Sequence, residues 1–180
     1  MRVISGSARG RKLKEPRGDD IRPTGDLVKE AVFNIIQFDV EGRRVLDLFA
    51  GTGQLGIEAL SRGAARAVFV DESRDALALV RENLQATGFS DGAEVVRGGA
   101  LPYLDRRERF DVVFLDPPYD SPLIAQSLQK IIEFDILKEN GIIVCEARVS
   151  MSLPELPPPF SAREYRYGKI KITVFRKDGL

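Results

Sequence analysis

The sequence has no histidine and only one cysteine, Cys145, among its 180 residues. Without histidine the chain cannot build a Ser–His or Cys–His couple for nucleophilic catalysis. One cysteine cannot form an internal disulfide, and zinc in proteins is usually held by histidine and cysteine side chains. We therefore expect no metal site, and we interpret Cys145 as a small buried hydrophobic residue.

Long apolar runs are also absent, and the start of the chain, Met1 to Gly6, lacks the apolar core of a signal peptide. We therefore expect no membrane segment and a cytoplasmic location. A chain of 180 residues with 43% hydrophobic content can bury one good core and is short for two. The expected organisation is a single domain over residues 1–180, in which residues 1–22 form a basic N-terminal extension.

The formal net charge is zero, but the charges are unevenly distributed. Residues 1–22 and 163–180 each carry +4, and the residues between them carry −8. Two basic ends on an acidic body favour contact with a polyanion, whereas the alternative is two solvated, lysine-rich edges that repel other strands. The pattern of residues 2–13 predicts a basic hairpin. Its candidate nucleic-acid-binding side chains, with the residue that follows, are Arg9, Arg11, Lys12 and Lys14.

The segment from Arg44 to Gly56 predicts a buried strand, a glycine-rich turn and the start of a helix. Its three glycines, Gly51, Gly53 and Gly56, have the spacing of a dinucleotide-binding fingerprint. Asp71 lies twenty residues after Gly51, where an acid could bind a ribose hydroxyl. The segment therefore predicts a site for a nucleotide-like ligand.

Asp47, four residues before Gly51, distinguishes between two such ligands. A carboxylate there would repel a pyrophosphate, but it suits a cationic, amine-bearing ligand such as S-adenosylmethionine. We therefore favour a methyltransferase. An NAD-dependent oxidoreductase and a non-catalytic nucleic-acid-binding module remain the alternatives from other functional classes.

Strand and helix patterns alternate through most of the chain, which predicts an α/β fold with a parallel sheet covered by helices. Thr24 is predicted to cap a first helix with the apolar positions of residues 27–36 on its inner face, and Arg22 and Thr24 could meet a ligand carboxylate. Later strands are expected over residues 67–70, 93–96, 110–115 and 142–145. Later helices are expected over 73–87, with Ser73 as its cap and Gly88 closing it, and over 122–134. Residues 162–175 predict a hairpin added antiparallel at the sheet edge. Ligands bind at the carboxyl ends of parallel strands, where the pattern places Asp47, Asp71, Gly99 and Asp116.

A second motif, Asp116-Pro117-Pro118-Tyr119, follows the apolar strand that begins at Phe110. The prolines stiffen the turn, so the Asp116 carboxylate and the Pro117 carbonyl could both accept hydrogen bonds from one exocyclic amine. Tyr119 could stack on the base that carries this amine. The purely structural interpretation is an acidic strand end followed by a stiff turn.

Several segments together resemble the bacterial methyltransferases that modify guanine N2 of small-subunit (16S) ribosomal RNA. They are the opening Ile4 to Leu13, Arg22-Pro23-Thr24, Glu30-x-x-Phe33-Asn34, the segment from Asp47 to Ala64, and Asp116 to Tyr119. The resemblance implies a Rossmann-like methyltransferase fold with a mostly parallel seven-stranded sheet. It also implies S-adenosylmethionine as donor and guanine in ribosomal RNA as acceptor, either free or within an assembled small subunit. Adenine N6 in DNA and a protein glutamine are alternative acceptors.

The resemblance also implies roles for individual residues. Asp47, Gly51 and Gly53 would hold the methionine part of the donor, Asp71 the ribose, and residues 116–119 the target base. Leu27 and Lys29 stand where the family usually has arginine, and Gly99 stands where it often has Asp or Asn, so the adenine could be held near Ala100. The predicted cofactor-binding residues are Arg22, Thr24, Asp47, Phe49, Gly51, Gly53, Asp71, Glu72, Gly99 and Ala100.

Overall fold

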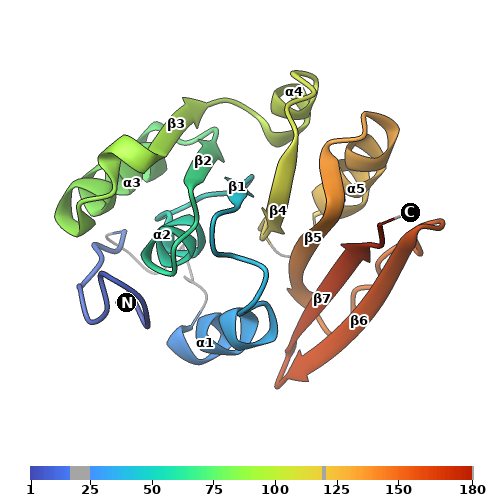
Figure 1. The fold of residues 1–180 in the computed structure, drawn as a ribbon, viewed down its shortest axis with the longest axis horizontal. Coiled ribbons are helices and arrows are strands. Elements are labelled where there is room, and N and C mark those ends of the chain that lie inside the picture. Colours follow the sequence, from blue (N-terminus) through green and yellow to red (C-terminus); the bar gives the residue numbers. More distant parts are fainter. Residues whose placement is uncertain (17–24, 119–120, 180) are drawn as a thin grey trace.

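The structure is a computed structural model that describes residues 1–16, 25–118 and 121–179 (Figure 1). Its helices are α1 (Asp26–Ile35), α2 (Gln54–Ser61), α3 (Arg74–Thr87), α4 (Ala100–Leu104) and α5 (Leu123–Glu133), with a 3-10 turn over Ser90–Gly92. Its strands are β1 (Arg44–Asp47), β2 (Arg66–Asp71), β3 (Ala93–Arg97), β4 (Phe110–Leu115), β5 (Leu137–Arg148), β6 (Phe160–Tyr167) and β7 (Ile170–Lys177).

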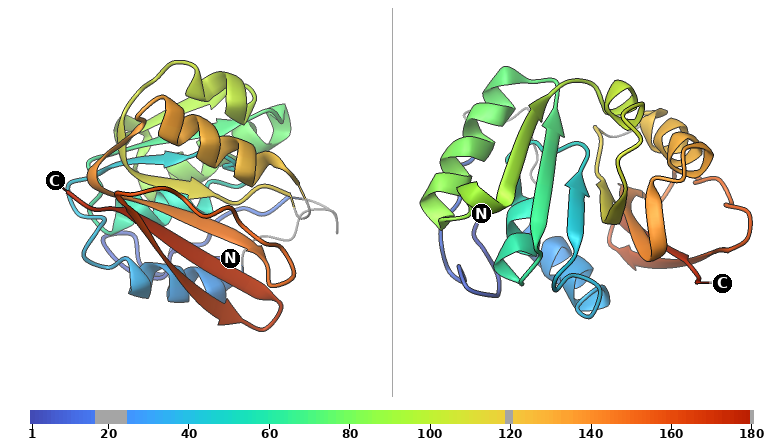
Figure 2. Two further views of the ribbon diagram at one scale, coloured as in Figure 1. Left: turned by 90° about the vertical axis from the view of Figure 1, so that its right-hand side faces the viewer. Right: turned by 45° about the horizontal axis from the view of Figure 1, so that its top comes forward.

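The strands form one seven-stranded sheet in the order β3-β2-β1-β4-β5-β7-β6. Strands β1 to β5 pair in parallel, whereas β7 pairs antiparallel with both β5 and β6. The β6–β7 hairpin lies at the far edge of the sheet, and Figure 2 shows it turned toward the viewer in the left-hand view. The predicted Rossmann-like sheet and its antiparallel edge hairpin are confirmed.

The central strands are apolar on both faces because helices cover both faces. On one face, Val45 of β1 packs in a cluster with residues of α1, α2 and α3. On the other, Leu46 packs in a second cluster with residues of α4 and α5. Cys145 is fully buried in this second cluster, as predicted. Because α2, α3, α4 and α5 each follow the carboxyl end of a parallel strand, the loops that lead into them lie at the same edge of the sheet.

Helix α1 differs in detail from its prediction. It begins at Asp26 with Gly25 at the N-cap, so Thr24 is not the cap residue. Leu27, expected on the inner face, is 83% exposed, whereas Lys29 is fully buried. The inner face is completed by Phe33, which packs on Phe114 with ring centroids 5.7 Å apart. The prediction for Leu27 was therefore wrong, because a charged residue with a buried partner takes the place of an apolar one.

The other helix boundaries follow local chemistry. Ser73 caps α3 by accepting a 3.2 Å hydrogen bond from the Ala76 amide, as predicted. Helix α5 begins at Leu123 with Pro122 at its N-cap, one residue later than expected. Helix α4 was not predicted, because five residues with a proline among them leave no periodic signal. None of the helices in the described residues has the length and apolar character needed to cross a bilayer.

Candidate active site

A tight loop joins β1 to α2 at the carboxyl edge of the sheet. Gly53 is the N-cap of α2 with φ of +79°, a backbone conformation that favours glycine. At Gly56 the reason for glycine is space, because a Cβ there would come within 2.3 Å of the Phe69 ring on β2. The glycines therefore allow both the turn and the close approach of α2 to the sheet.

Asp47 ends β1 beneath this loop and is only 1% exposed. Its Oδ2 accepts a 3.1 Å hydrogen bond from the Gly56 amide. The pKa of Asp47 is raised to about 7, mainly by burial and in smaller part by the charges of Asp116 and Asp71, while the hydrogen bond from Gly56 acts in the opposite direction. The charges of Asp71 and Asp116 therefore both act on Asp47, although the three aspartates come from three different strand ends.

Asp71 ends β2 and holds the loop from the other side. Its Oδ2 accepts a 2.9 Å hydrogen bond from the Gly51 amide, and its Oδ1 accepts a 2.8 Å bond from the Ser73 amide. The loop backbone is tied to β2 again where the Ala50 amide donates to the Val70 carbonyl at 2.9 Å. The carboxylate predicted to bind a ribose thus also fixes the first glycine of the loop.

Glu72 and Gly99 are brought together from neighbouring strands. A Cβ built on Gly99 would lie 2.7 Å from Glu72 Oε1, so the carboxylate lies directly against this glycine. Gly99 is the N-cap of α4, and Ala100, its first residue, is buried. Phe49 is half-buried against the second apolar cluster. The absence of a side chain at Gly99 therefore leaves room for the Glu72 carboxylate.

Asp116 and the prolines directly follow β4. The Leu48 amide still donates to the Phe114 carbonyl at 3.3 Å, so β1 and β4 remain paired up to this point. Asp116 is half-buried, Pro117 is buried and Pro118 is exposed. Tyr119, Arg22 and Thr24 lie outside the described residues. The first part of the predicted acceptor motif therefore lies beside the glycine loop, as expected from the strand order.

Glu146 is a candidate that sequence reasoning missed. The pairing of Leu115 with Cys145 places Glu146 beside Asp116, one step beyond the last paired residues of β4. Phe114 and Val144 pack in the first apolar cluster, so alternation returns residues 116 and 146 to the same face. Glu146 is 6% exposed. An acid directly after the apolar run that ends at Cys145 was the available signal.

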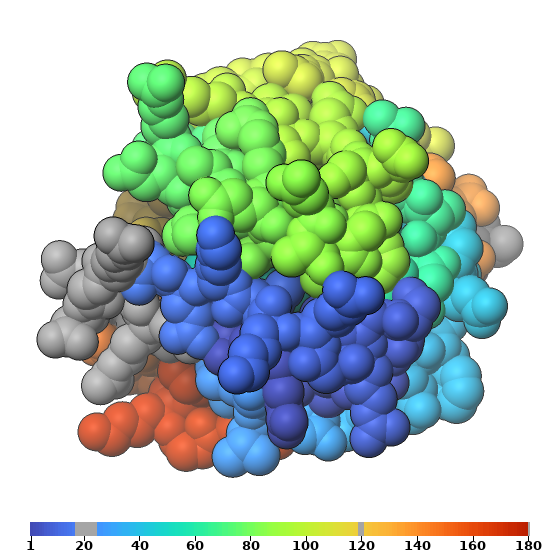
Figure 3. Space-filling model, turned by 90° about the vertical axis from the view of Figure 1, so that its left-hand side faces the viewer, coloured from blue at the N-terminus to red at the C-terminus, as the bar shows by residue number. Residues whose placement is uncertain are grey.

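The four basic candidates of the N-terminal hairpin are exposed (Figure 3). Lys14 pairs with Glu82 at 2.6 Å, and Arg11 donates to the Ala86 carbonyl at 3.2 Å. In the described part of the chain, the side chains of Arg9 and Lys12 make no hydrogen bond or ion pair. Figure 3 shows the hairpin packed between α1 and the surface of α3 and β3.

Lys29, by contrast, does not add to this basic surface. It is fully buried, and its ammonium group donates to the Arg2 carbonyl and lies 3.9 Å from Glu58. Burial lowers its pKa, while the charge of Glu58 acts in the opposite direction. Lys29 therefore cannot offer its charge at the surface in the way that an exposed arginine would. No group of three or more metal-binding side chains occurs in residues 1–16, 25–118 and 121–179.

Comparison with known proteins assigns the chain to a family. A family model described as "Conserved hypothetical protein 95" matches residues 1–176. The chain belongs to this family. One relative, YlbH of Bacillus subtilis (strain 168), is 42% identical over 184 residues, which cover 99% of this chain and all of the relative. Another, "Ribosomal RNA small subunit methyltransferase D" of Escherichia coli (strain K12), is 33% identical over 180 residues, covering 99% of this chain and 90% of the relative.

The fold of the family is also known from solved structures. The structure of yhhF from Escherichia coli matches with a TM-score of 0.89 and 31% sequence identity, and the match covers 100% of this chain and 99% of that one. Such agreement over both whole chains means that the order of the strands and the loops at their carboxyl ends are family features. The Rossmann-like methyltransferase fold is therefore confirmed.

Proposed function

We propose that the protein transfers a methyl group from S-adenosylmethionine to the exocyclic N2 amine of a guanine in 16S ribosomal RNA. The observation that carries the donor assignment is the buried carboxylate of Asp47 beneath the glycine loop, on which the charges of Asp71 and Asp116 also act. A ligand with a positive sulfonium and a positive ammonium group relieves the repulsion between these charges and Asp47, whereas the pyrophosphate of NAD would increase it. The donor, when bound, supplies an electrophilic methyl group.

Within this site Asp71 accepts from the ribose, and Gly51 and Gly53 let the loop backbone approach the methionine part. Glu72, beside Gly99, serves as the acceptor at the adenosine end, where Ala100 begins α4. Asp47 is too buried to be an open binding surface, so it acts through its charge and through the Gly56 amide. Arg22, Thr24 and Phe49 complete the proposed donor site.

The acceptor side uses Asp116 to Tyr119. The Asp116 carboxylate and the Pro117 carbonyl accept hydrogen bonds from the amine, which keeps its lone pair available for the methyl carbon. Once the nitrogen is methylated, Asp116 can take the proton that leaves it. Tyr119 stacks on the base. Most of the rate then comes from orientation and exclusion of water, so the absence of histidine is no obstacle.

Asp116 and Glu146, which follow the paired residues Leu115 and Cys145 on adjacent strands, favour guanine over adenine. Guanine has two adjacent donors, N1–H and the N2 amine, whereas the N1 of adenine is an acceptor beside its N6 amine. Two acidic acceptors side by side match the first pattern and oppose the second. This arrangement supports guanine N2 ahead of adenine N6 and of a glutamine amide, which has no second donor of this kind.

Ribosomal RNA as the substrate is supported by the name of the Escherichia coli relative and by the basic hairpin. Arg9, Arg11, Lys12 and Lys14 provide exposed positive charge on the N-terminal hairpin, which contacts α3 through Arg11 and Lys14. We assign these four residues to phosphate contacts with the RNA, either free or in an assembled small subunit.

The test is methyl transfer to small ribosomal subunits that lack the modification, with labelled donor. After digestion of the RNA to nucleosides, we expect the label in N2-methylguanosine. Label in N6-methyladenosine or in protein would assign the site to another acceptor, and the absence of any transfer by folded, donor-binding protein would overturn the proposed reaction. The Asp116→Ala variant serves as the control for background transfer.

A further inference from the structure

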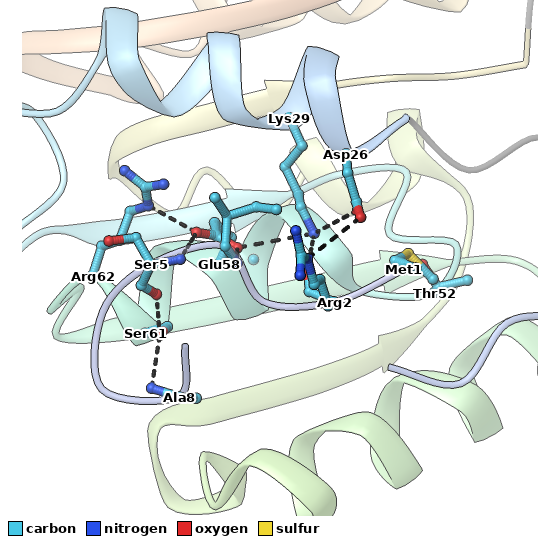
Figure 4. Close-up of polar contacts among 12 residues, drawn as sticks. Met1, Arg2, Ser5, Ala8, Asp26, Lys29, Thr52, Glu58, Ser61 and Arg62 are labelled. Carbon is cyan, nitrogen blue, oxygen red and sulfur yellow. Dashed lines mark hydrogen bonds and ion pairs between the residues drawn. The ribbon is translucent and has the colours of Figure 1, made fainter. Parts of the chain in front are cut away.

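The N-terminal hairpin is docked on the body by its backbone, through buried polar side chains. Glu58 of α2 is fully buried, and its two carboxylate oxygens accept from the amides of Ile4 (2.8 Å) and Ser5 (3.0 Å). Ser61 Oγ accepts from the Ala8 amide at 3.0 Å (Figure 4). Gly6, with φ of +85°, lies so close that a Cβ would be 1.8 Å from the Ser61 carbonyl oxygen. The hairpin backbone is therefore an integral part of the fold.

Asn83 of α3 makes the contact that links this hairpin to the glycine loop. Its side chain is fully buried. Its Oδ1 accepts from the Lys14 amide at 2.7 Å, and its Nδ2 donates to the Lys14 carbonyl at 3.1 Å. The same Nδ2 donates to the Thr52 carbonyl at 3.0 Å. One amide group thus holds the end of the hairpin and the loop residue that lies between Gly51 and Gly53.

A second contact joins the same two segments. The hydroxyl of Thr52 donates to the sulfur of Met1 at 3.6 Å, and Thr52 itself is buried. The loop is therefore anchored from two sides, at Gly51 by Asp71 and at Thr52 by Asn83. Because glycines restrict the backbone so little, such external anchors determine how far the loop keeps one conformation before a ligand binds.

We propose that Asn83 is a positioning residue for the donor site. The backbone of Lys14 fixes the Asn83 amide, and this amide holds the Thr52 carbonyl, so the hairpin supports the donor loop as well as contacting RNA. This inference rests on the proposed function of the glycine loop. If hairpin docking stabilises the donor-binding conformation, donor binding must stabilise hairpin docking by the same free energy. The side-chain charges of the hairpin have no part in this support.

Two matched pairs of variants separate this role from general stability. Lys14→Pro removes the amide that donates to Asn83, whereas Lys14→Ala keeps this amide and removes only the side chain with its exposed ion pair to Glu82. Asn83→Ala removes the bonds to Lys14 and Thr52, whereas Ser61→Ala removes hairpin bonds that do not reach the loop. We expect Lys14→Pro and Asn83→Ala to weaken donor binding in calorimetry by roughly tenfold, and the two controls to stay within about twofold.

Separate measurement of the donor KM and of kcat distinguishes a positioning role from a purely structural one, because only a positioning role predicts a change in KM with little change in kcat. Asn83→Ala should raise the KM for the donor, with kcat at saturating donor changed by less than about threefold. If wild type binds donor and transfers methyl groups but Asn83→Ala and Ser61→Ala bind donor equally well, the positioning role of Asn83 is disproved and the proposed function stands. If wild-type protein itself does not bind S-adenosylmethionine, the proposed function fails first.

Hydrogen exchange on the wild-type protein tests the same link without a substitution. Donor binding should slow exchange of the Lys14 amide more than that of the Ser7 amide, which donates to the Ser61 carbonyl at 2.8 Å and serves as the internal control. Equal protection of the two amides, or none at Lys14, contradicts the link between the hairpin and the donor loop. This measurement remains decisive if a variant fails to fold.

Discussion

The carboxylate of Asp71 accepts a 2.9 Å hydrogen bond from the backbone amide of Gly51, so the acid that ends β2 holds the first glycine of the loop that follows β1. The same carboxylate is our candidate for binding the donor ribose. Removal of the Asp71 side chain would therefore remove the proposed ribose contact and release the loop at the same time. It would also remove the hydrogen bond from the Ser73 amide at the start of α3.

Asp71→Ala should therefore weaken donor binding by at least about tenfold, because hydrogen bonds to a charged group contribute about 1.5 to 3 kcal/mol each. Calorimetric titration with S-adenosylmethionine measures this loss. Asp75→Ala, an exposed acid on the first turn of α3, is the control and should leave the affinity unchanged. Equal affinity in the wild type and in Asp71→Ala would show that this acid only ends a strand.

Asp116→Ala should abolish methyl transfer while leaving donor affinity within a few-fold of wild type. Asp116 is assigned to the amine of the base, and the loss of its negative charge is partly offset because Asp47 then ionises more readily, so donor affinity should change little. Donor titration and single-turnover transfer to small subunits together test this separation. A folded variant that loses both properties to the same extent would place Asp116 in the donor site instead.

The raised pKa of Asp47 predicts proton release when donor binds. At pH 6 the buried carboxyl of the free protein holds a proton, since its pKa is about 7, and a cationic ligand favours the ionised form. Calorimetry at pH 6 in two buffers of different ionisation enthalpy should therefore show release of close to one proton, and donor affinity should weaken as the pH falls below 7. Asp47→Asn should bind more weakly and release none.

The same pKa has a consequence for stability in the absence of donor. The folded-state value of about 7 lies above the ordinary value of 3.8. The stabilisation that comes from proton binding at Asp47 is therefore complete below pH 3.8 and is lost as the pH rises to about 7. In urea unfolding, the free energy of unfolding of wild type should therefore fall relative to that of Asp47→Asn as the pH rises from 3.8 to about 7. A constant difference would mean that the pKa of Asp47 is close to 3.8.

What the sequence could predict was the arrangement along single elements. Apolar runs ending in Asp47, Asp71 and Asp116 predicted three strands and their carboxyl edge, and the glycine spacing predicted the loop, because each signal lies within a few consecutive residues. Ser73 and Gly88 likewise marked the ends of α3. Glu146 was missed although its signal was of the same kind, an acid that follows an apolar run.

What the sequence could not predict depends on partners far apart in the chain. Lys29 can be buried because its ammonium group pairs with Glu58 and donates to the Arg2 carbonyl. Hydrophobic periodicity does not predict such a contact. Leu27 is exposed for the complementary reason, since α1 turns its polar Lys29 inward. Asn83 looks like an ordinary helix residue in the sequence. Its role depends on contact with Lys14, which lies 69 residues earlier in the chain.

Glu146→Gln should reduce discrimination at the base. We expect kcat/KM for guanine to fall by about 10- to 100-fold, because the N1–H of the base loses a charged acceptor. An RNA with 2-aminopurine at the mapped position keeps the N2 amine but lacks N1–H, so wild type should strongly prefer guanine over it and Glu146→Gln should not. Glu139→Gln, exposed at the other end of β5, is the control. A wild-type enzyme that accepts both bases equally would remove Glu146 from base recognition.

Neutralising the hairpin should lower RNA affinity and flatten its dependence on salt. Arg9 and Lys12 have no partner among the described residues and can turn to phosphates at no cost, whereas Lys14 must leave Glu82. Arg9→Ala with Lys12→Ala should reduce the slope of log affinity against log salt by roughly 0.7 to 0.9 for each phosphate that is no longer neutralised. Lys130→Ala with Lys138→Ala, which break pairs with Asp105 and Asp111, should change it less. An unaltered slope in the hairpin variant would make the hairpin a solvated edge, and the RNA would then have to be held by other loops or by the basic β6–β7 hairpin.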